Sequence, residues 1–200
     1  MPNIMIHEQV GYFISKKLNI SSYDYYLGLL SPDTPNLEGF GIKEERWTSH
    51  VRMKDLNEWK INLNNFYKKE KNNYPKDFLL GYYIHILTDI IFDDILYKKV
   101  RKEIMNDNYL KEASHDIMRD DMDKFYFNEI EEIKEILKEN NNSYNILNNN
   151  KENILKWKNK QLNNFTNKNT SKYITEDIIK TLDEEVLNEL HENIEFIKIT

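Results

Sequence analysis

Apolar residues recur at intervals of three or four along most of this chain, which is the spacing of one face of an α-helix. In residues 4–18 this apolar face contains a histidine, His7. We find no alternation typical of a strand, no repeat, no heptad array and no glycine-rich phosphate loop. The pattern predicts an all-α fold, a multi-helix bundle. The expected helices cover residues 4–18, 22–30, 55–71, 76–105, 108–138 with a break near Phe127, the residues around Trp157, and 175–197.

Two polar stretches interrupt the helical pattern. Residues 31–41, SPDTPNLEGFG, contain two prolines and two glycines and predict a loop. Residues 139–153 are rich in asparagine and predict a surface connection. We therefore expect one helical domain over 1–200, made of a core with the candidate metal site (1–138), this connection, and C-terminal helices (154–200).

The composition narrows the chemistry that the chain can perform. The net charge is −6, and there is no cysteine, which excludes disulfides, thiolate metal sites and thiol nucleophiles. A metal would have to be held by His, Asp, Glu, backbone or water, ligands that suit zinc, manganese or iron. The acidic balance disfavours binding to a nucleic-acid duplex. The N-terminal MPNIMIHEQVGYF has no basic region and no long apolar run, so we expect no signal peptide, no transmembrane segment and a cytoplasmic protein.

One strongly apolar helix carries two polar residues on the same face. Residues 81–94, GYYIHILTDIIFDD, read as the middle of a buried helix, yet His85 and Asp89 lie one turn apart within it. Burying either group without a partner is costly. Two interpretations stay open: a core histidine hydrogen-bonded to a nearby carboxylate, or a metal chelated by two side chains of one helix.

Three more residues could complete such a metal site. His7 lies on the apolar face of the first helix, Asp33 stands between two prolines, and His50 precedes a predicted helix in RWTSHVR. Each has an ordinary explanation, as a core histidine, a turn residue or part of a capping region. With His85 and Asp89 they would form a set of nitrogen and oxygen ligands for a transition metal.

Residues close in sequence to Asp33 and His50 allow two interpretations as well. Nearby cations could receive a phosphate or form a solvated basic turn. Nearby aromatic residues could line a pocket or belong to the core. The cations are Lys43, Arg46 and Arg52, and the aromatic residues are Tyr23, Tyr25, Tyr26 and Trp47.

The order of these residues resembles that of the zinc-dependent phospholipase C family, which is related to the S1/P1 nucleases. The resemblance rests on His7 in MPNIMIHEQVG, then YLGLLSPDTP, TSH and GYYIHILTD, and it covers the first half of the chain, to near Leu96. It implies a bundle of the phospholipase C/P1 nuclease type. It also implies a hydrolase of phosphoester bonds that uses one or two zinc ions, or manganese or iron, on a small phosphoester or a phospholipid head group.

The resemblance implies a role for each ligand. Asp33, His50, His85 and Asp89 match the ligands of one zinc, and Asp89 would bridge to a second ion that His7 also binds. Asp33 matches the candidate base for the attacking water. Two such ions can stabilise both the attacking and the leaving oxygens of a phosphoester.

The chain departs from the family at a third zinc site. The family has a His six residues after the bridging Asp, where this chain has Ile95, and a later His-x-x-x-Glu, where His115 is followed by Arg119. We expect the third site to be absent or rebuilt, and the possible substitutes are Asp93, His115, Asp116, Asp120 and Asp121.

Two other functions compete with this one. An HD-type phosphohydrolase is also helical, and the His115–Asp116 doublet would fit it, but that interpretation leaves Asp33 and His50 unexplained. The third hypothesis is a non-enzymatic helical protein whose metal is structural or vestigial. His191, in the last helix, is expected to be a surface or packing residue, and the sequence does not predict the oligomeric state.

Overall fold

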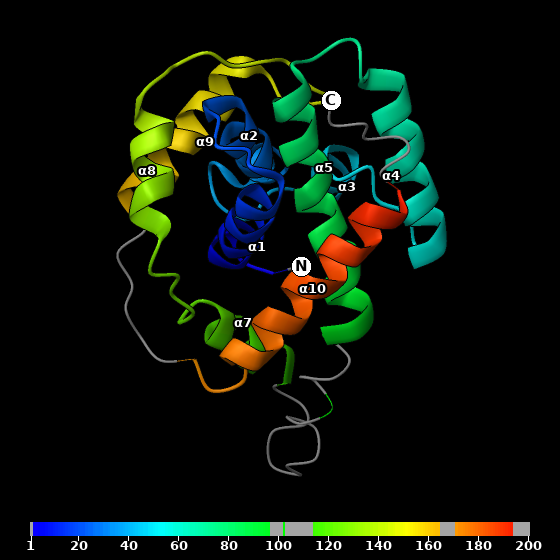
Figure 1. Cartoon of the computed structure of the whole chain (residues 1–200), viewed down its shortest axis with the longest axis vertical. Coiled ribbons are helices and arrows are strands. Elements are labelled where there is room, and N and C mark those ends of the chain that lie inside the picture. The colour runs from blue at the N-terminus through cyan, green and yellow to red at the C-terminus, as the bar shows by residue number, and fades with distance from the viewer. Residues whose placement is uncertain (1, 97–101, 103–113, 165–170, 194–200) are drawn as a thin grey trace.

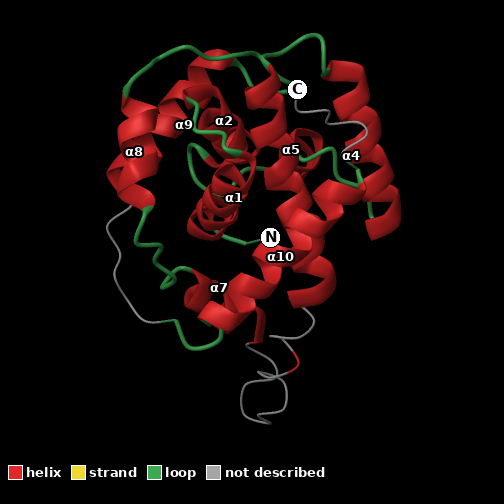
Figure 2. Ribbon diagram, viewed as in Figure 1, coloured by secondary structure: helices red, strands yellow, loops and turns green. Residues whose placement is uncertain are grey.

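The predicted helices are the main elements of the computed structural model of the chain, which describes residues 2–96, 102, 114–164 and 171–193, with no side-chain description at 95, 96, 114 and 115. All regular elements in these ranges are helical, so the all-α prediction is confirmed (Figure 2). The elements are α1 Ile4–Leu18, α2 Tyr23–Leu30, the 3-10 helix η1 Ser31–Asn36, α3 Lys43–Ser49, α4 Leu56–Glu70, α5 Lys76–Ile91, the π-helical turn η2 Phe92–Leu96, α7 Ser114–Met122, α8 Ile130–Lys138, α9 Lys151–Asn164 and α10 Glu176–Glu192.

Side-chain caps fix the starts of several helices. The side chains of Asn3, Ser22, Asp55 and Thr175 accept hydrogen bonds from free backbone N–H groups in the first turns of α1, α2, α4 and α10. Each cap satisfies a donor that has no partner within the helix. These boundaries therefore follow from short polar residues directly before apolar runs.

Helix α5 is the centre of the bundle. It is buried along its whole length except at its first two residues, and α1, α2, α4 and α10 all pack against it (Figure 1). Its closest neighbour is α2, because Gly81 brings the two backbones together: a Cβ at this position would lie 2.0 Å from the carbonyl oxygen of Tyr25. This close packing brings the end of α2 next to the middle of α5.

The remaining helices enclose this centre. Helices α8 and α9 both contact α2, and α10 crosses α1 and α5 (Figure 1). The side chain of Trp157 in α9 donates a hydrogen bond to the carbonyl of Leu30, 3.1 Å away. None of the described helices is both long and apolar enough to cross a membrane.

The structure corrects the predicted boundaries in three places. Residues 31–41 were expected to be a loop, but Ser31–Asn36 form a 3-10 helix, and α3 follows where no separate helix was expected. The expected helix 76–105 stops being α-helical after Ile91 and continues as the π-helical turn η2; 97–101 and 103–105 lie outside the described residues. The expected break near Phe127 is confirmed, between α7 and α8.

The asparagine-rich connection is not wholly a surface segment. Ile146 and Asn149 are buried and form an isolated bridge. The amide of Asn149 donates to the carbonyl oxygen of Ser31 at 3.0 Å, so this connection packs against the start of η1. Helix α9 then begins at Lys151, within the range that the sequence assigned to the connection.

Candidate metal centre

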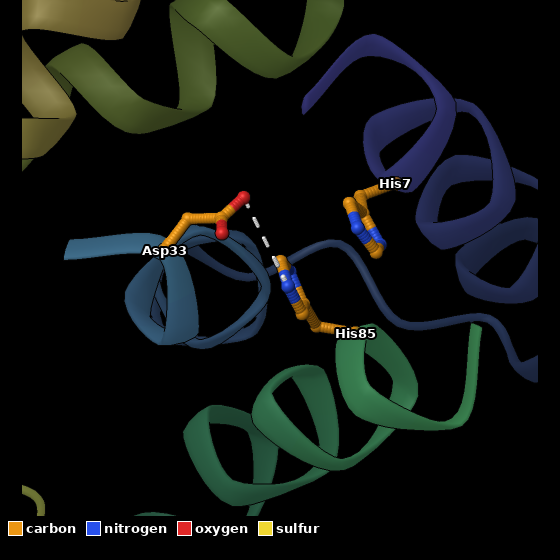
Figure 3. A group of neighbouring side chains, drawn as sticks. All are labelled: His7, Asp33 and His85. Carbon is orange, nitrogen blue, oxygen red and sulfur yellow. Dashed lines mark ion pairs between the residues drawn. The ribbon is translucent and has the colours of Figure 1, made fainter. Parts of the chain in front are cut away.

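All five residues that the sequence singled out as metal ligands meet in one buried cluster. His7 comes from α1, Asp33 from η1, His50 from the end of α3, and His85 and Asp89 from α5. Each is buried. Figure 3 shows His7, Asp33 and His85 approaching one another from three separate elements. The interpretation of His85 and Asp89 as an isolated core pair therefore omits three of the groups that surround them.

Nitrogen and oxygen atoms face one another across the cluster at short distances. Nε2 of His50 lies 3.4 Å from one oxygen of Asp89 and 3.6 Å from Asp33. Nε2 of His85 lies 4.0 Å from each of the same two carboxylates. The other oxygen of Asp89 lies 3.5 Å from Nε2 of His7. Asp89 is thus at the centre, with one oxygen toward His7 and the other toward His50 and His85.

Backbone carbonyls fix the orientation of two of the imidazoles. Nδ1 of His85 lies 2.7 Å from the carbonyl oxygen of Leu29, and Nδ1 of His50 lies 2.8 Å from that of Arg46. A carbonyl can only accept, so each Nδ1 carries the hydrogen. In the neutral rings both Nε2 atoms then present lone pairs to the cluster, which is how a backbone carbonyl orients a metal-binding histidine.

The Nε2 atoms of His50 and His85 are so close together that a cation must lie near both of them. They lie 3.3 Å apart, and neither neutral ring has a hydrogen to place between them. A proton or a metal ion must therefore balance the two lone pairs. In a tetrahedral zinc site with Zn–N bonds of 2.0–2.1 Å, two ligand nitrogens are about 3.3–3.4 Å apart. The observed distance matches this spacing.

The cluster also contains polar atoms that form no hydrogen bond with the described part of the protein. These are both oxygens of Asp89, which lie only within ion-pair distance of the imidazoles, and Nδ1 of His7. The ring of His7 stacks on that of His85 with centroids 3.7 Å apart. Buried polar atoms are nearly always hydrogen-bonded in folded proteins, so orphaned ones in the same cluster indicate an absent ligand.

Local structure around His50 explains how this residue is held. His50 is the C-cap of α3, and the next residue, Val51, has φ of 44°, in the left-handed region that β-branched residues rarely adopt. The strained backbone is held by Asn62, whose amide donates to the carbonyl of Val51 at 2.7 Å. Trp59 donates to the carbonyl of His50 at 2.9 Å. Strain of this kind is commonly found at functional sites.

The buried environment sets the charges of the cluster residues. Burial lowers the pKa of His85 to about 3, with a further contribution from His7, so this ring stays neutral. Burial also opposes the charged forms of Asp89 and His50, but the contact of Asp89 with His7 and the contact of His50 with Asp33 outweigh it. The pKa of Asp89 therefore lies below its ordinary value, and that of His50 lies above it. Asp33 behaves like Asp89, because its contact with His50 outweighs burial.

Other predicted site residues lie elsewhere. Tyr25 and Tyr26 are core residues: the hydroxyl of Tyr25 donates to Gly11, and that of Tyr26 lies 2.9 Å from Ser15. Tyr23 is also buried, with its hydroxyl bonded to Asn142, and Trp47 is half-buried on α3.

None of the substitutes expected for a third metal site joins the cluster within the described residues. Asp93 forms an ion pair with Arg52 at 2.8 Å, and Asp116 is exposed and pairs with Arg119. Asp121 accepts hydrogen bonds from residues 171–174. The side chains of Ile95 and His115 lie outside the described residues, and His191 is exposed, as expected.

Sequence reasoning missed several polar groups. Glu8, next to His7 in the chain, is fully buried, and neither of its oxygens forms a hydrogen bond with the described residues; burial raises its pKa well above the usual range. The sequence feature that could have indicated this buried group is the position of an acidic residue on the second turn of an apolar helix. The amide nitrogen of Asn36 lies 3.2 Å from Asp33. Nothing in the sequence indicated this contact except that Asn36 follows Asp33 by three residues.

Comparisons with family models, with curated proteins and with solved structures find no match for this chain. The buried His and Asp cluster, which could hold a metal ion, is therefore the main evidence about function.

Proposed function

We propose that this protein is a metal-dependent phosphoester hydrolase of the phospholipase C/P1 nuclease type. The observation that carries the proposal is the meeting of His7, Asp33, His50, His85 and Asp89 in one buried cluster. These residues belong to segments that resemble the family in the same order along the chain. Such a set of five ligands is far more specific than any one of its members.

Zinc is the ion that the ligands fit best. Two neutral imidazoles and two carboxylates are a common donor set for zinc, and they also accept manganese or iron. The 3.3 Å distance between the two Nε2 atoms supports tetrahedral zinc. His50, His85, Asp33 and Asp89 would hold this ion. The oxygen of Asp89 that faces His7 would serve a second ion, because a carboxylate in this position can bridge two cations.

Asp33 is the residue that we assign to the reaction. Bound zinc lowers the pKa of a coordinated water to about 7 and so supplies a hydroxide near neutral pH. Asp33 is the most exposed ligand of the cluster, with 11% of its side chain accessible. Asp33 is ionised and would accept a hydrogen bond or proton from water, while the amide of Asn36 holds its orientation. The substrate would be a small phosphoester or a phospholipid head group.

Turnover of a chromogenic phosphodiester by the zinc-loaded protein tests the proposal. The rate should rise with pH and level off near or above neutrality, as a metal-bound water ionises. Asp33→Asn should lower the rate by about 100-fold or more while it retains some metal, because an amide oxygen can coordinate but cannot take the proton. Zinc, manganese and iron should each be assayed with diesters, monoesters and phosphatidylcholine. A rate no higher than that of Asp33→Asn with every ion and substrate would contradict the proposal.

One observation favours a second candidate, a metal that only stabilises the fold. Four of the five ligand side chains have an exposed fraction of 1% or less, and closed sites are typical of structural metals. In that case zinc would raise the melting temperature, and the panel of substrates would show no turnover.

A further inference from the structure

Within the part of the chain that the structure describes, Asp33 is the most exposed ligand of the cluster. The side chain of Asp33 has an exposed fraction of 11%, whereas those of His7, His50, His85 and Asp89 have 0–1%. A molecule that reaches the cluster therefore approaches past Asp33. The groups that surround Asp33 decide which molecules can do so.

A chain of hydrogen bonds leads from Asp33 to Arg46. The amide nitrogen of Asn36 lies 3.2 Å from Oδ1 of Asp33, and its amide oxygen accepts from the backbone N–H of Gly41 at 3.1 Å. The carbonyl oxygen of Gly41 then accepts from Nε of Arg46 at 2.9 Å. The guanidinium group of Arg46 is thereby attached to the same short segment that carries Asp33.

Glycine is required at the middle of this chain. A Cβ on residue 41 would lie 2.3 Å from the carbonyl oxygen of Pro35, so any other residue would push this segment away from η1. The close approach keeps Arg46 near η1. Burial and the charge of Arg52 lower the pKa of Arg46 while Asp33 raises it, which means that the guanidinium lies within electrostatic range of both.

The two arginines of this region differ in their partners. The guanidinium of Arg52 stacks on Trp59, 4.6 Å from the ring centroid, and forms an ion pair with Asp93 at 2.8 Å. Arg46 stacks on the exposed ring of Phe40 at 3.7 Å, but among the described residues it has no carboxylate within ion-pair distance. Only its Nε makes a hydrogen bond there, so its terminal Nη groups can bind a ligand.

We propose that Arg46 is a substrate-binding residue that receives a non-bridging oxygen of a phosphate group as this group approaches Asp33. This inference rests on the proposed function and adds the residue that recognises the anion. A guanidinium suits the role because its planar N–H groups match two phosphate oxygens at once. Phe40 and the hydrogen bond to Gly41 hold the group in place, which reduces the rotational freedom lost on binding.

Binding of inorganic phosphate to the zinc-loaded protein tests the inference without turnover. Calorimetry should compare the wild type with Arg46→Ala, Arg46→Lys and the control Lys43→Ala. Lys43 is an exposed cation on the same helix, stacked on Trp47. We expect a rise in Kd of about tenfold or more for Arg46→Ala, a smaller rise for Arg46→Lys, and less than about twofold for Lys43→Ala. Zinc content and melting temperature, measured for every variant, identify any loss of the metal or the fold.

Equal phosphate affinity in wild type and Arg46→Ala, both zinc-loaded and folded, would overturn the inference. Kinetics with a phosphodiester and a phosphomonoester then separate it from the proposed function. An increase in KM for Arg46→Ala with either ester supports the inference and shows which ester uses the site. Turnover that is insensitive to Arg46→Ala would overturn this inference alone. Phosphate binding that depends on Arg46, with no turnover of any ester, would overturn the hydrolase and leave an anion-binding site.

Discussion

Two buried polar regions of this protein differ in whether their groups have partners. In the C-terminal part, the ammonium group of Lys158 is buried and donates to the carbonyls of Leu137 and Asn140 and to the side chain of Asn141. It thus connects α9 to the end of α8 and to the residues that follow it with three hydrogen bonds. In the metal cluster, both oxygens of Asp89 and Nδ1 of His7 form no hydrogen bond with the described residues.

Asp121 strengthens the contrast. Its carboxylate accepts from the hydroxyl of Ser171 and from the backbone N–H groups of residues 172–174, and thereby joins α7 to the segment before α10. These hydrogen bonds lower its pKa against the effect of burial. Asp121 was a possible metal ligand in the sequence, but its carboxylate instead forms hydrogen bonds that stabilise the fold.

The difference separates structural polar groups from binding groups. A buried charge with a complete set of hydrogen bonds needs nothing more, whereas a buried group without hydrogen bonds destabilises the fold unless a ligand binds it. Asp33, His50 and His85 each have a hydrogen-bond partner, so the indication of a ligand comes from Asp89 and His7. Four predictions test this distinction.

Zinc should have the largest effect on stability. At a free concentration about 1,000 times its Kd, zinc should stabilise the protein by about 4 kcal/mol, which is roughly 8–16 °C in melting temperature for a chain of this length. Thermal unfolding with and without a chelator measures this shift. A protein shown to have lost its metal, but with an unchanged melting temperature, would weigh against the cluster as a zinc site.

Replacing the central carboxylate should sharply weaken metal binding. Asp89→Asn should raise the Kd for zinc by about 100-fold, because Asp89 faces all three imidazoles of the cluster. The matched control is Asp93→Asn, one turn later, where the carboxylate pairs with Arg52 instead. Competition with a zinc-binding dye gives both affinities, and an equal loss in the two variants would remove the distinction between them.

Lys158→Met should destabilise the fold but leave metal binding unchanged. The substitution keeps the buried length of the side chain and removes the donors for two carbonyls, one buried and one half-buried, which should cost about 2–3 kcal/mol. Lys156→Met, at an exposed position of the same helix, is the control. Urea unfolding of the metal-free proteins measures the loss. A parallel decrease in zinc affinity would mean that the two regions are coupled.

The smallest effect is expected at Asp183, a buried carboxyl outside the cluster. One oxygen faces Gln9 at 3.4 Å, and the other forms no hydrogen bond with the described residues. Burial, with a smaller contribution from Glu184 and against the contact with Gln9, raises the pKa of Asp183 to about 7. An unfolded aspartate titrates near 3.9, so the folded state binds more protons between about pH 4 and 7, and its stability falls over this range as pH rises.

Asp183→Asn removes this ionisation. It should stabilise the protein by about 1–2 kcal/mol above pH 7, and the gain should vanish near pH 4. Unfolding measured at both pH values in the presence of a chelator excludes any contribution from metal. A gain that is the same at both values would show that Asp183 does not titrate as described.

Much of this architecture could be predicted from the sequence. The periodicity of apolar residues gave the main helices, because each buries one face in the core. The ligands were readable because His7, His85 and Asp89 stand on apolar faces where polar side chains are costly. The boundaries that failed, at η1 and α3, lie in a segment whose short helices are held by tertiary contacts such as the bond from Asn149 to Ser31.

The details of the cluster were beyond sequence reasoning. The carbonyl of Leu29 that orients His85 comes from a residue 56 positions earlier. Likewise, Asp121 was indistinguishable from its acidic neighbours until the partners in residues 171–174 were known. Local patterns identify which groups are buried, but the partners come from distant segments and depend on the packing of the helices.

Locating bound zinc is the most direct test of the central claim, that the five residues of the cluster form a metal site. Crystals grown with one equivalent of zinc should give an anomalous peak between His50 and His85, about 2.0–2.1 Å from both Nε2 atoms and about 2.0–2.2 Å from Asp89 or Asp33. A second equivalent should add a peak between Asp89 and His7. Zinc bound only at surface carboxylates, with these five side chains unchanged and no density among them, would contradict the account.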